Sequence, residues 1–202
     1  SVPSSIVPPE VVDTKESVVE DTIRLVKKYH DRSRFSMCQV GIAPSIAQYE
    51  TEDIIEAVVD LAEEYDIMVH GHLAESQHEV EYTLKTWGCR PFEWFKRHRL
   101  LGKRFYFAHC IHLNEEEIAQ MAETGTGVAH CPISNMLLSS GACPVPSYLE
   151  HGLTRIGLGV DGAASSNSSN MLEEIRCAYL LNRLTWGDKA ATPDDYLYMA
   201  TA

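Results

Sequence analysis

Apolar residues follow two spacings along the chain, and stretches with these two spacings alternate. Apolar residues that recur every three or four positions predict amphipathic helices, and short apolar runs predict buried strands. The helical spacing occurs at 13–30, 51–65, 79–87, a segment ending at 100, 114 onward, 144–152, 170–184 and 192 onward. The strand pattern occurs at 35–43, 68–74, 104–111, 126–131 and 155–161. The chain is therefore expected to alternate between strands and helices.

Strands that alternate with helices and are apolar throughout are typical of a parallel sheet with both faces covered. We therefore expect an α/β fold with about five β/α units, in which 1–202 forms a single domain. An open doubly wound sheet and a (β/α) barrel share this pattern, so the polar residues must separate them.

Composition and charge narrow the range of partners. The 202 residues are 45% hydrophobic and carry a formal net charge of −12, which argues against a nucleic-acid polymer or an anionic membrane surface as partner. No apolar run approaches the roughly 20 residues of a membrane span, and the first residues lack a signal-peptide pattern. The six cysteines form no CxxC pair, so we expect reduced thiols and a cytoplasmic protein.

Acid and base side chains collect at the expected strand ends. His72 and Glu75 end one strand, His109 the next, His130 the one after it, and Asp161 the last. In a (β/α) barrel these ends meet on one face, where active sites form. A histidine followed three residues later by a carboxylate suggests a metal ligand beside a group that carries protons. We therefore expect His72, His109 and Asp161 to converge on one pocket with Glu75 at its rim.

Each of these residues also has a structural explanation. His72 and Glu75 could be a buried histidine and a helix-capping carboxylate, and His109 could anchor a turn. His130 is interpreted as a structural or substrate-contacting residue, and Asp161 before a glycine could cap the next helix. Four such residues at consecutive strand ends are hard to explain by packing alone, because each buried charge must be compensated.

Four segments together resemble the amidohydrolase superfamily, in particular its branch of 8-oxoguanine and guanine-type deaminases, S-adenosylhomocysteine deaminases and s-triazine chlorohydrolases. The resemblance depends on their order along the chain and covers nearly all of it. The segments are His72-Leu73-Ala74-Glu75, Phe107-Ala108-His109-Cys110-Ile111-His112-Leu113, Gly127-Val128-Ala129-His130-Cys131-Pro132-Ile133-Ser134-Asn135 and Gly157-Leu158-Gly159-Val160-Asp161-Gly162-Ala163.

The resemblance implies a distorted (β/α) barrel with one metal ion, usually zinc and sometimes iron, at its C-terminal mouth. By matching motif, His72 would be a metal ligand, and Asp161 would be a ligand that also takes a proton from the bound water. Glu75 would protonate a ring nitrogen of the substrate. His109 would polarise the attacking hydroxide and in some members approaches the metal. These implied roles agree with the chemistry expected from the residues, because a metal lowers the pKa of bound water and carboxylates manage the protons.

The resemblance implies deamination of an aminated small heterocycle, with 8-oxoguanine or guanine as first candidates and a homo-oligomer as the full-length state. The alternatives are a hydrolytic dechlorinase or another C–N hydrolase of s-triazine-like rings, and an inactive barrel fragment. The family's first strand carries an HxH pair, but the only HxH here, His70-Gly71-His72, matches a later strand. The chain therefore looks like a partial barrel, about five of eight units, without the first strands.

Two loops bear on the substrate. The segment 45–49 is shorter than the family's usual loop, which leaves the substrate preference open. Residues 163–170, rich in serine and asparagine, are expected to close over the substrate, and the alternative is that they only cap the following helix.

Overall fold

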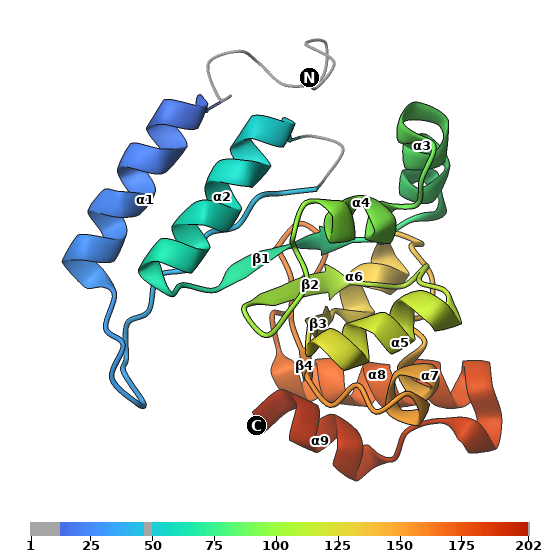
Figure 1. Ribbon diagram of the computed structural model, residues 1–202. Helices are drawn as coiled ribbons and strands as arrows, with labels where there is room; N and C mark the ends of the chain where they lie inside the picture. Colours follow the sequence, from blue (N-terminus) through green and yellow to red (C-terminus); the bar gives the residue numbers. More distant parts are fainter. Residues whose placement is uncertain (1–12, 47–49, 202) are drawn as a thin grey trace.

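Four parallel strands form one sheet in the order β1-β2-β3-β4 (Figure 1). The computed structural model describes residues 13–46 and 50–201. The strands are β1 (Val69–Leu73), β2 (Phe105–His109), β3 (Gly127–His130) and β4 (Ile156–Leu158). In their parallel register, Val69 lies opposite Phe105, and Val128 lies opposite both Phe107 and Ile156. Strand order that follows chain order, with a helix between each pair, is the arrangement of a (β/α) barrel wall.

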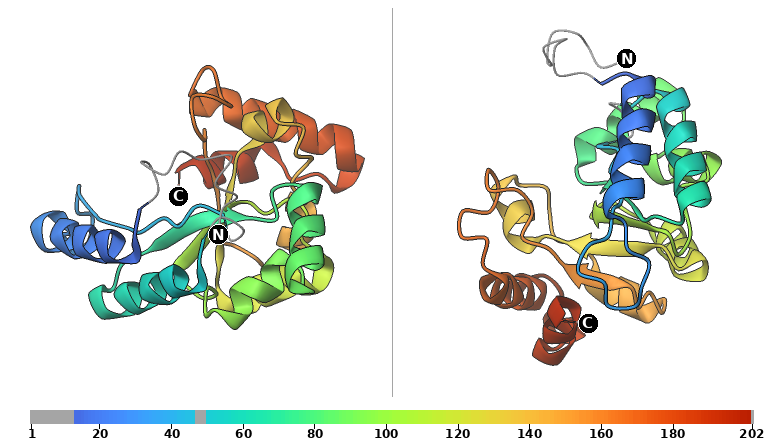
Figure 2. Two further views of the ribbon diagram at one scale, coloured as in Figure 1. Left: turned by 90° about the horizontal axis from the view of Figure 1, so that it is seen from above. Right: turned by 90° about the vertical axis from the view of Figure 1, so that its left-hand side faces the viewer.

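Helices connect the strands and flank the sheet. Figure 1 shows α1 and α2 lying side by side next to β1, and α8 and α9 beyond β4; Figure 2 gives two further views. The helices are α1 (Lys15–Tyr29), α2 (Glu52–Tyr65), α3 (Gln77–Trp87), α4 (Pro91–Arg97), α5 (Glu115–Thr124), α6 (Pro132–Leu137), α7 (Val145–Glu150), α8 (Met171–Trp186) and α9 (Pro193–Thr201), with a 3-10 turn η3 (Gly187–Lys189).

The two faces of the sheet differ. Side chains alternate along a strand, and one face carries Val69, Phe107 and Val128, all buried beneath the helices. Helix α4 contributes Phe95, whose ring meets that of Phe107 edge to face at 4.8 Å. The other face carries His72 and is half-buried along β1. In a barrel this second face is the inner one, so the structure is a partial (β/α) barrel, as expected from the sequence.

The fifth expected strand, 35–43, does not form, and this part of the prediction was wrong. Only isolated bridges join this segment and the residues after it to β1, Ile42 to Val69 and Ile46 to His72. Ile42 keeps the two parallel bonds to the backbone of Met68 and His70. The next ladder donor would be Pro44, which has no N–H group, so pairing is interrupted there and resumes only as the isolated bridge at Ile46.

Other differences concern element ends. The helix α6 follows Cys131 directly and was not expected, although a proline at its first position is a helix-start signal. Strand β4 ends at Leu158, so Asp161 lies in a loop beyond the strand rather than at its end. Within residues 13–46 and 50–201, no helix is long and apolar enough to cross a membrane.

Candidate active site

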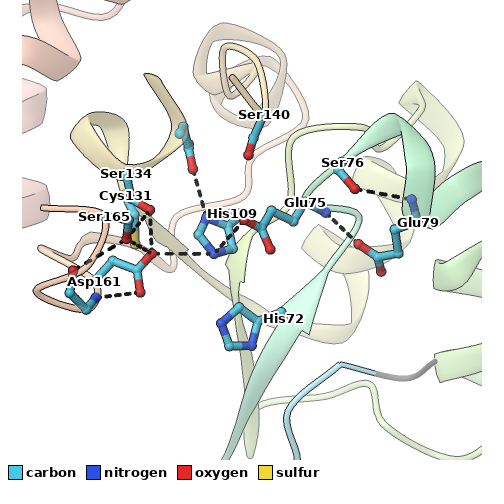
Figure 3. Close-up of polar contacts among 12 residues, drawn as sticks. His72, Glu75, Ser76, Glu79, His109, Cys131, Ser134, Ser140, Asp161 and Ser165 are labelled. Atoms are coloured by element: carbon cyan, nitrogen blue, oxygen red, sulfur yellow. Dashed lines mark hydrogen bonds and ion pairs between the residues drawn. The ribbon is translucent and has the colours of Figure 1, made fainter. Parts of the chain in front are cut away.

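His72 lies on the inner face of β1 (Figure 3), and one of its ring nitrogens is held by the backbone. Its Nδ1 lies 3.0 Å from the carbonyl oxygen of Ser45, and because a carbonyl only accepts, Nδ1 carries the proton. The lone pair of the imidazole is therefore on Nε2. A metal-binding histidine is commonly oriented by such a bond from its other nitrogen. The ring stacks on that of His109, with centroids 5.3 Å apart.

His109 is the last residue of β2 and is almost fully buried, with 1% of its surface exposed. Its Nδ1 donates to Oδ1 of Asn135 at 2.7 Å, which leaves the Nε2 lone pair free. That nitrogen lies 3.8 Å from Oε1 of Glu75 and 3.9 Å from Oδ2 of Asp161 (Figure 3). The backbone φ of His109 is 69°, a conformation that non-glycine residues adopt at a cost. The turn therefore points the imidazole at two carboxylates.

Asp161 is held by hydrogen bonds from two segments. Ser134 Oγ donates to its Oδ2 at 2.5 Å, Ser165 Oγ approaches the same oxygen at 3.3 Å, and the N–H of Gly162 donates to Oδ1 at 2.7 Å. Burial acts to raise the pKa of Asp161, but these bonds and the nearby His109 together lower it below its ordinary value. Asp161 is therefore a carboxylate at neutral pH, able to bind a cation or accept a proton.

The structure thus brings together the four side chains chosen from the sequence. His72 and His109 lie on β1 and β2, Glu75 and Asp161 follow β1 and β4 in the chain, and 17% of the Glu75 side chain is exposed. Two carboxylates face His109 Nε2, so a cation or a proton between them would be stabilised. The nitrogen and oxygen donors are those zinc prefers, and the residues present fit a metal site.

A thiol, Cys131, also lies beside this cluster. Its sulfur, a ring nitrogen of His109 and a carboxylate oxygen of Asp161 all lie within 4.8 Å of one another. Burial, reinforced by nearby Asp161, raises the pKa of the Cys131 thiol to about 12, and its Sγ donates to the carbonyl of Ala129 at 3.6 Å. The protonated thiol packs as a small apolar group, as expected from the sequence.

Three supporting residues were missed in the sequence. Ser134 and Asn135 orient Asp161 and His109 from α6, and Glu79 contacts the backbone beside Glu75. The helix-start proline at 132 could have located the first two, and the Ser76-x-x-Glu79 spacing typical of a helix start could have located the third.

His130, at the end of β3, is fully buried and its Nδ1 has no hydrogen-bond partner among the described residues. Burial, with a smaller contribution from His109, lowers the pKa of His130 from 6.5 to about 3. The imidazole is therefore neutral in the folded protein under conditions where the unfolded chain is protonated.

Acid should destabilise the fold through His130. Because its folded pKa lies below the unfolded value of 6.5, its contribution is complete above pH 6.5 and is lost as the pH falls toward 3. The expected slope is about 1.4 kcal/mol per pH unit in that window. Urea unfolding at pH 7.5 and 5.5 should show a smaller pH difference for His130→Leu than for the parent. His78→Gln, at an exposed position, is the control, and equal differences in all three proteins would contradict the prediction.

Comparison with known proteins agrees with this geometry. Residues 3–202 match the family model described as the amidohydrolase family. The chain belongs to the amidohydrolase family. It is 40% identical over 194 residues to 8-oxoguanine deaminase of Pseudomonas aeruginosa, covering 96% of this chain and 43% of that protein. The resemblance seen in the sequence is confirmed.

Solved amidohydrolase-type structures superpose closely on the chain. Triazine hydrolase from Arthrobacter aurescens has a TM-score of 0.92 at 27% identity, covering 97% of this chain and 43% of that chain. An adenosine deaminase from Xanthomonas campestris with bound zinc has a TM-score of 0.77 at 30% identity, covering 87% of this chain and 38% of that chain. The chain therefore spans less than half the length of the proteins it matches.

Proposed function

We propose that this amidohydrolase chain forms part of a zinc-dependent hydrolase that deaminates an aminated heterocycle, with a purine such as 8-oxoguanine or guanine as substrate. The observation that carries the proposal is the position of His109 Nε2, within 4 Å of carboxylate oxygens of both Glu75 and Asp161. The 8-oxoguanine deaminase to which the chain is 40% identical supports the substrate class.

The proposed roles follow from the atoms that face the site. Zinc, when bound, would supply a hydrolytic nucleophile by lowering the pKa of a water to about 7. His72 and Asp161 would hold the metal, with His109 beside them. Asp161 would accept the proton that the water loses, and Glu75 would deliver a proton to the ring nitrogen next to the attacked carbon. The water oxygen ends on that carbon. Glu75 then takes the second proton of the water and gives it to the amino group, the C–N bond breaks, and ammonia leaves, while the proton on Asp161 returns to Glu75.

His72 and Asp161 give two protein ligands, fewer than the three that a catalytic zinc site has beside its open position. We propose that the missing ligands come from outside residues 1–202. We also propose that the full-length protein is cytoplasmic and homo-oligomeric. The six free cysteines support the cytoplasmic location. The homo-oligomeric state is a prediction, and a measurement of molecular mass in solution tests it.

A second candidate function is hydrolysis of a substituted s-triazine, favoured by the TM-score of 0.92 to triazine hydrolase. The same residues would serve both reactions, so the leaving group must be measured. The intact gene product should be assayed with 8-oxoguanine, guanine, an adenosine analogue and a chloro-s-triazine, for ammonia and chloride release. Ammonia release that is lost on zinc chelation and restored by zinc supports the first function; chloride release alone supports the second.

Removing Asn135 should disturb His109 without touching the substrate. Asn135→Leu removes the acceptor of the Nδ1–H bond, and we expect a 10- to 100-fold loss of activity, roughly the scale for residues that orient ligand side chains. Asn135→Asp keeps an acceptor at the same place and should retain more activity. Steady-state kinetics and zinc content of the two variants provide the test, and equal activities would contradict it.

The loop at 163–170 divides into two parts. Ser165 is buried against Ser134 and Asp161, whereas Asn167 is exposed. Asn170 caps α8, accepting from the N–H of Leu172 at 3.1 Å, so the capping interpretation holds for that residue.

Asn167→Ala should raise KM by about 2- to 10-fold, the effect of one lost hydrogen bond, without changing the melting temperature. Ser165→Ala should lower kcat instead, because its hydroxyl contacts Asp161. Asn170→Ala, the cap control, should lower the melting temperature and leave KM unchanged. If Asn167→Ala behaved like the cap control, the loop would have no role at the substrate.

A further inference from the structure

Glu79 is a buried carboxylate that the proposed chemistry does not use. It lies in the first turn of α3 with 2% of its surface exposed. Glu117, another buried glutamate, forms an ion pair with Arg90 at 2.7 Å, but in the described part of the chain no lysine or arginine pairs with Glu79. Burial raises the pKa of Glu79 to about 7 even though two backbone N–H groups oppose the shift. A carboxyl group loses favourable solvation when it is buried, so the position of Glu79 needs an explanation.

Both oxygens of Glu79 bind the backbone just outside the helix. Oε1 accepts from the N–H of Ala74 at 3.0 Å, and Oε2 accepts from the N–H of Glu75 at 2.8 Å (Figure 3). Ala74 has a φ of 49°, a left-handed conformation that is strained for a residue with a Cβ. The carbonyl of Ala74 in turn accepts from the N–H groups of Ile111 and His112 at 3.0 and 2.9 Å. Glu79 therefore fixes the bend that joins the ends of β1 and β2.

Helix capping does not account for these bonds. Ser76 already caps α3 by accepting from the N–H of Glu79 at 3.2 Å. In a capping box the glutamate at the third helical position returns to the cap residue, and Glu117 does so in α5, accepting from the N–H of Asn114 at 2.9 Å. Glu79 occupies the same helical position but reaches past Ser76 to the two residues before it.

We propose that Glu79 is the positioning residue of Glu75: by holding the N–H groups of Ala74 and Glu75, it directs the Glu75 carboxyl toward His109 and the substrate. Glu75 Oε1 lies 3.8 Å from His109 Nε2 on the far side of this bend. The inference rests on the proposed function of Glu75 as the proton donor. Glu79 itself reaches neither the substrate nor the reacting atoms.

Glu79→Gln in the zinc-loaded intact protein is the test, since glutamine keeps one acceptor and turns an N–H donor toward the other backbone N–H. We expect kcat to fall about 10- to 100-fold while KM changes less than threefold. The double variant E75Q/E79Q should be no slower than E75Q, because Glu79 acts only through Glu75. The matched control E117Q keeps one acceptor but removes the charge that pairs with Arg90, and it should lower the melting temperature at unchanged kcat. An unchanged kcat in E79Q, or losses that multiply in the double variant, would overturn the proposal.

Two further measurements keep the test decisive. If E79Q does not fold, the double variant A74G/E79Q relieves the left-handed strain at Ala74. This double variant should fold but should not regain kcat. Recovery of both would show that Glu79 only offsets strain. A crystal structure of E79Q should show a longer separation between Glu75 Oε1 and His109 Nε2, whereas E117Q should keep it. That distance is measured without an activity assay, so it is a separate readout. If it lengthens but E75Q keeps full turnover, the positioning stands and the proposed function of Glu75 fails.

Discussion

Asp161→Asn is expected to reduce turnover by about 10²- to 10⁴-fold, the usual range for a group that transfers a proton in the rate-limiting step. Asparagine keeps the size of the side chain but cannot take up the proton that the attacking water loses. It also replaces a carboxylate oxygen that accepts from Ser134 at 2.5 Å. The expected result therefore combines lost proton transfer with a weaker ligand for zinc.

The measurement must separate these two effects. Zinc content by elemental analysis and turnover at saturating zinc should be determined for Asp161→Asn in the intact protein. Asp188→Asn is the control, because the Asp188 side chain is 99% exposed and, among the described residues, forms an ion pair only with Arg183 at the surface. Normal turnover of the Asp161 variant with full zinc would overturn the proposed mechanism, whereas full recovery by added zinc would leave Asp161 as a ligand alone.

The fold followed from the sequence where local patterns decide structure. The strand expected at 68–74 forms, with His70 and His72 on one face. The helix expected from 114 onward also forms, and Asn114 caps it by accepting from the N–H of Glu117. The apolar run at 35–43, which ends just before Pro44, was expected to pair but does not form a strand. The hydrogen-bond ladder is interrupted at Pro44 because strand pairing needs a backbone N–H donor at every second residue. A run of apolar residues does not indicate whether those donors are present.

The site could be predicted only as a set of residues. His72, Glu75, His109 and Asp161 stood out because each is a titratable residue at or just after an expected strand end. Their supporting bonds join residues far apart in the sequence, such as His109 with Asn135 and Asp161 with Ser134. No local spacing predicts such pairs. The left-handed backbone at His109 and Asp161 could likewise not be assigned from residue type, because histidine and aspartate adopt it more often than most non-glycine residues but still uncommonly.

Glu75→Gln should also reduce deamination by about 10²- to 10⁴-fold, with an effect that depends on the leaving group. Glutamine cannot protonate the ring nitrogen, nor can it hand a proton to the departing amine. Ammonia must leave protonated, but chloride leaves as an anion. The loss is therefore expected to be larger for an amino-substituted ring than for its chloro analogue. In contrast, Asp161→Asn should slow both substrates equally, because the water must lose its proton in either reaction.

Rates on the paired substrates, with zinc content checked, decide the assignment of Glu75. Glu81→Gln is the matched control: Glu81 lies on the same helix, is exposed, and contacts only Gln77 in the hydrogen bond at 3.3 Å. A Glu75 variant slowed equally on both rings would show that the carboxyl protonates the ring but does not serve the leaving group. A variant that deaminates at the parent rate would remove Glu75 from the mechanism, and another proton donor would then have to reach the space between His109 and Asp161.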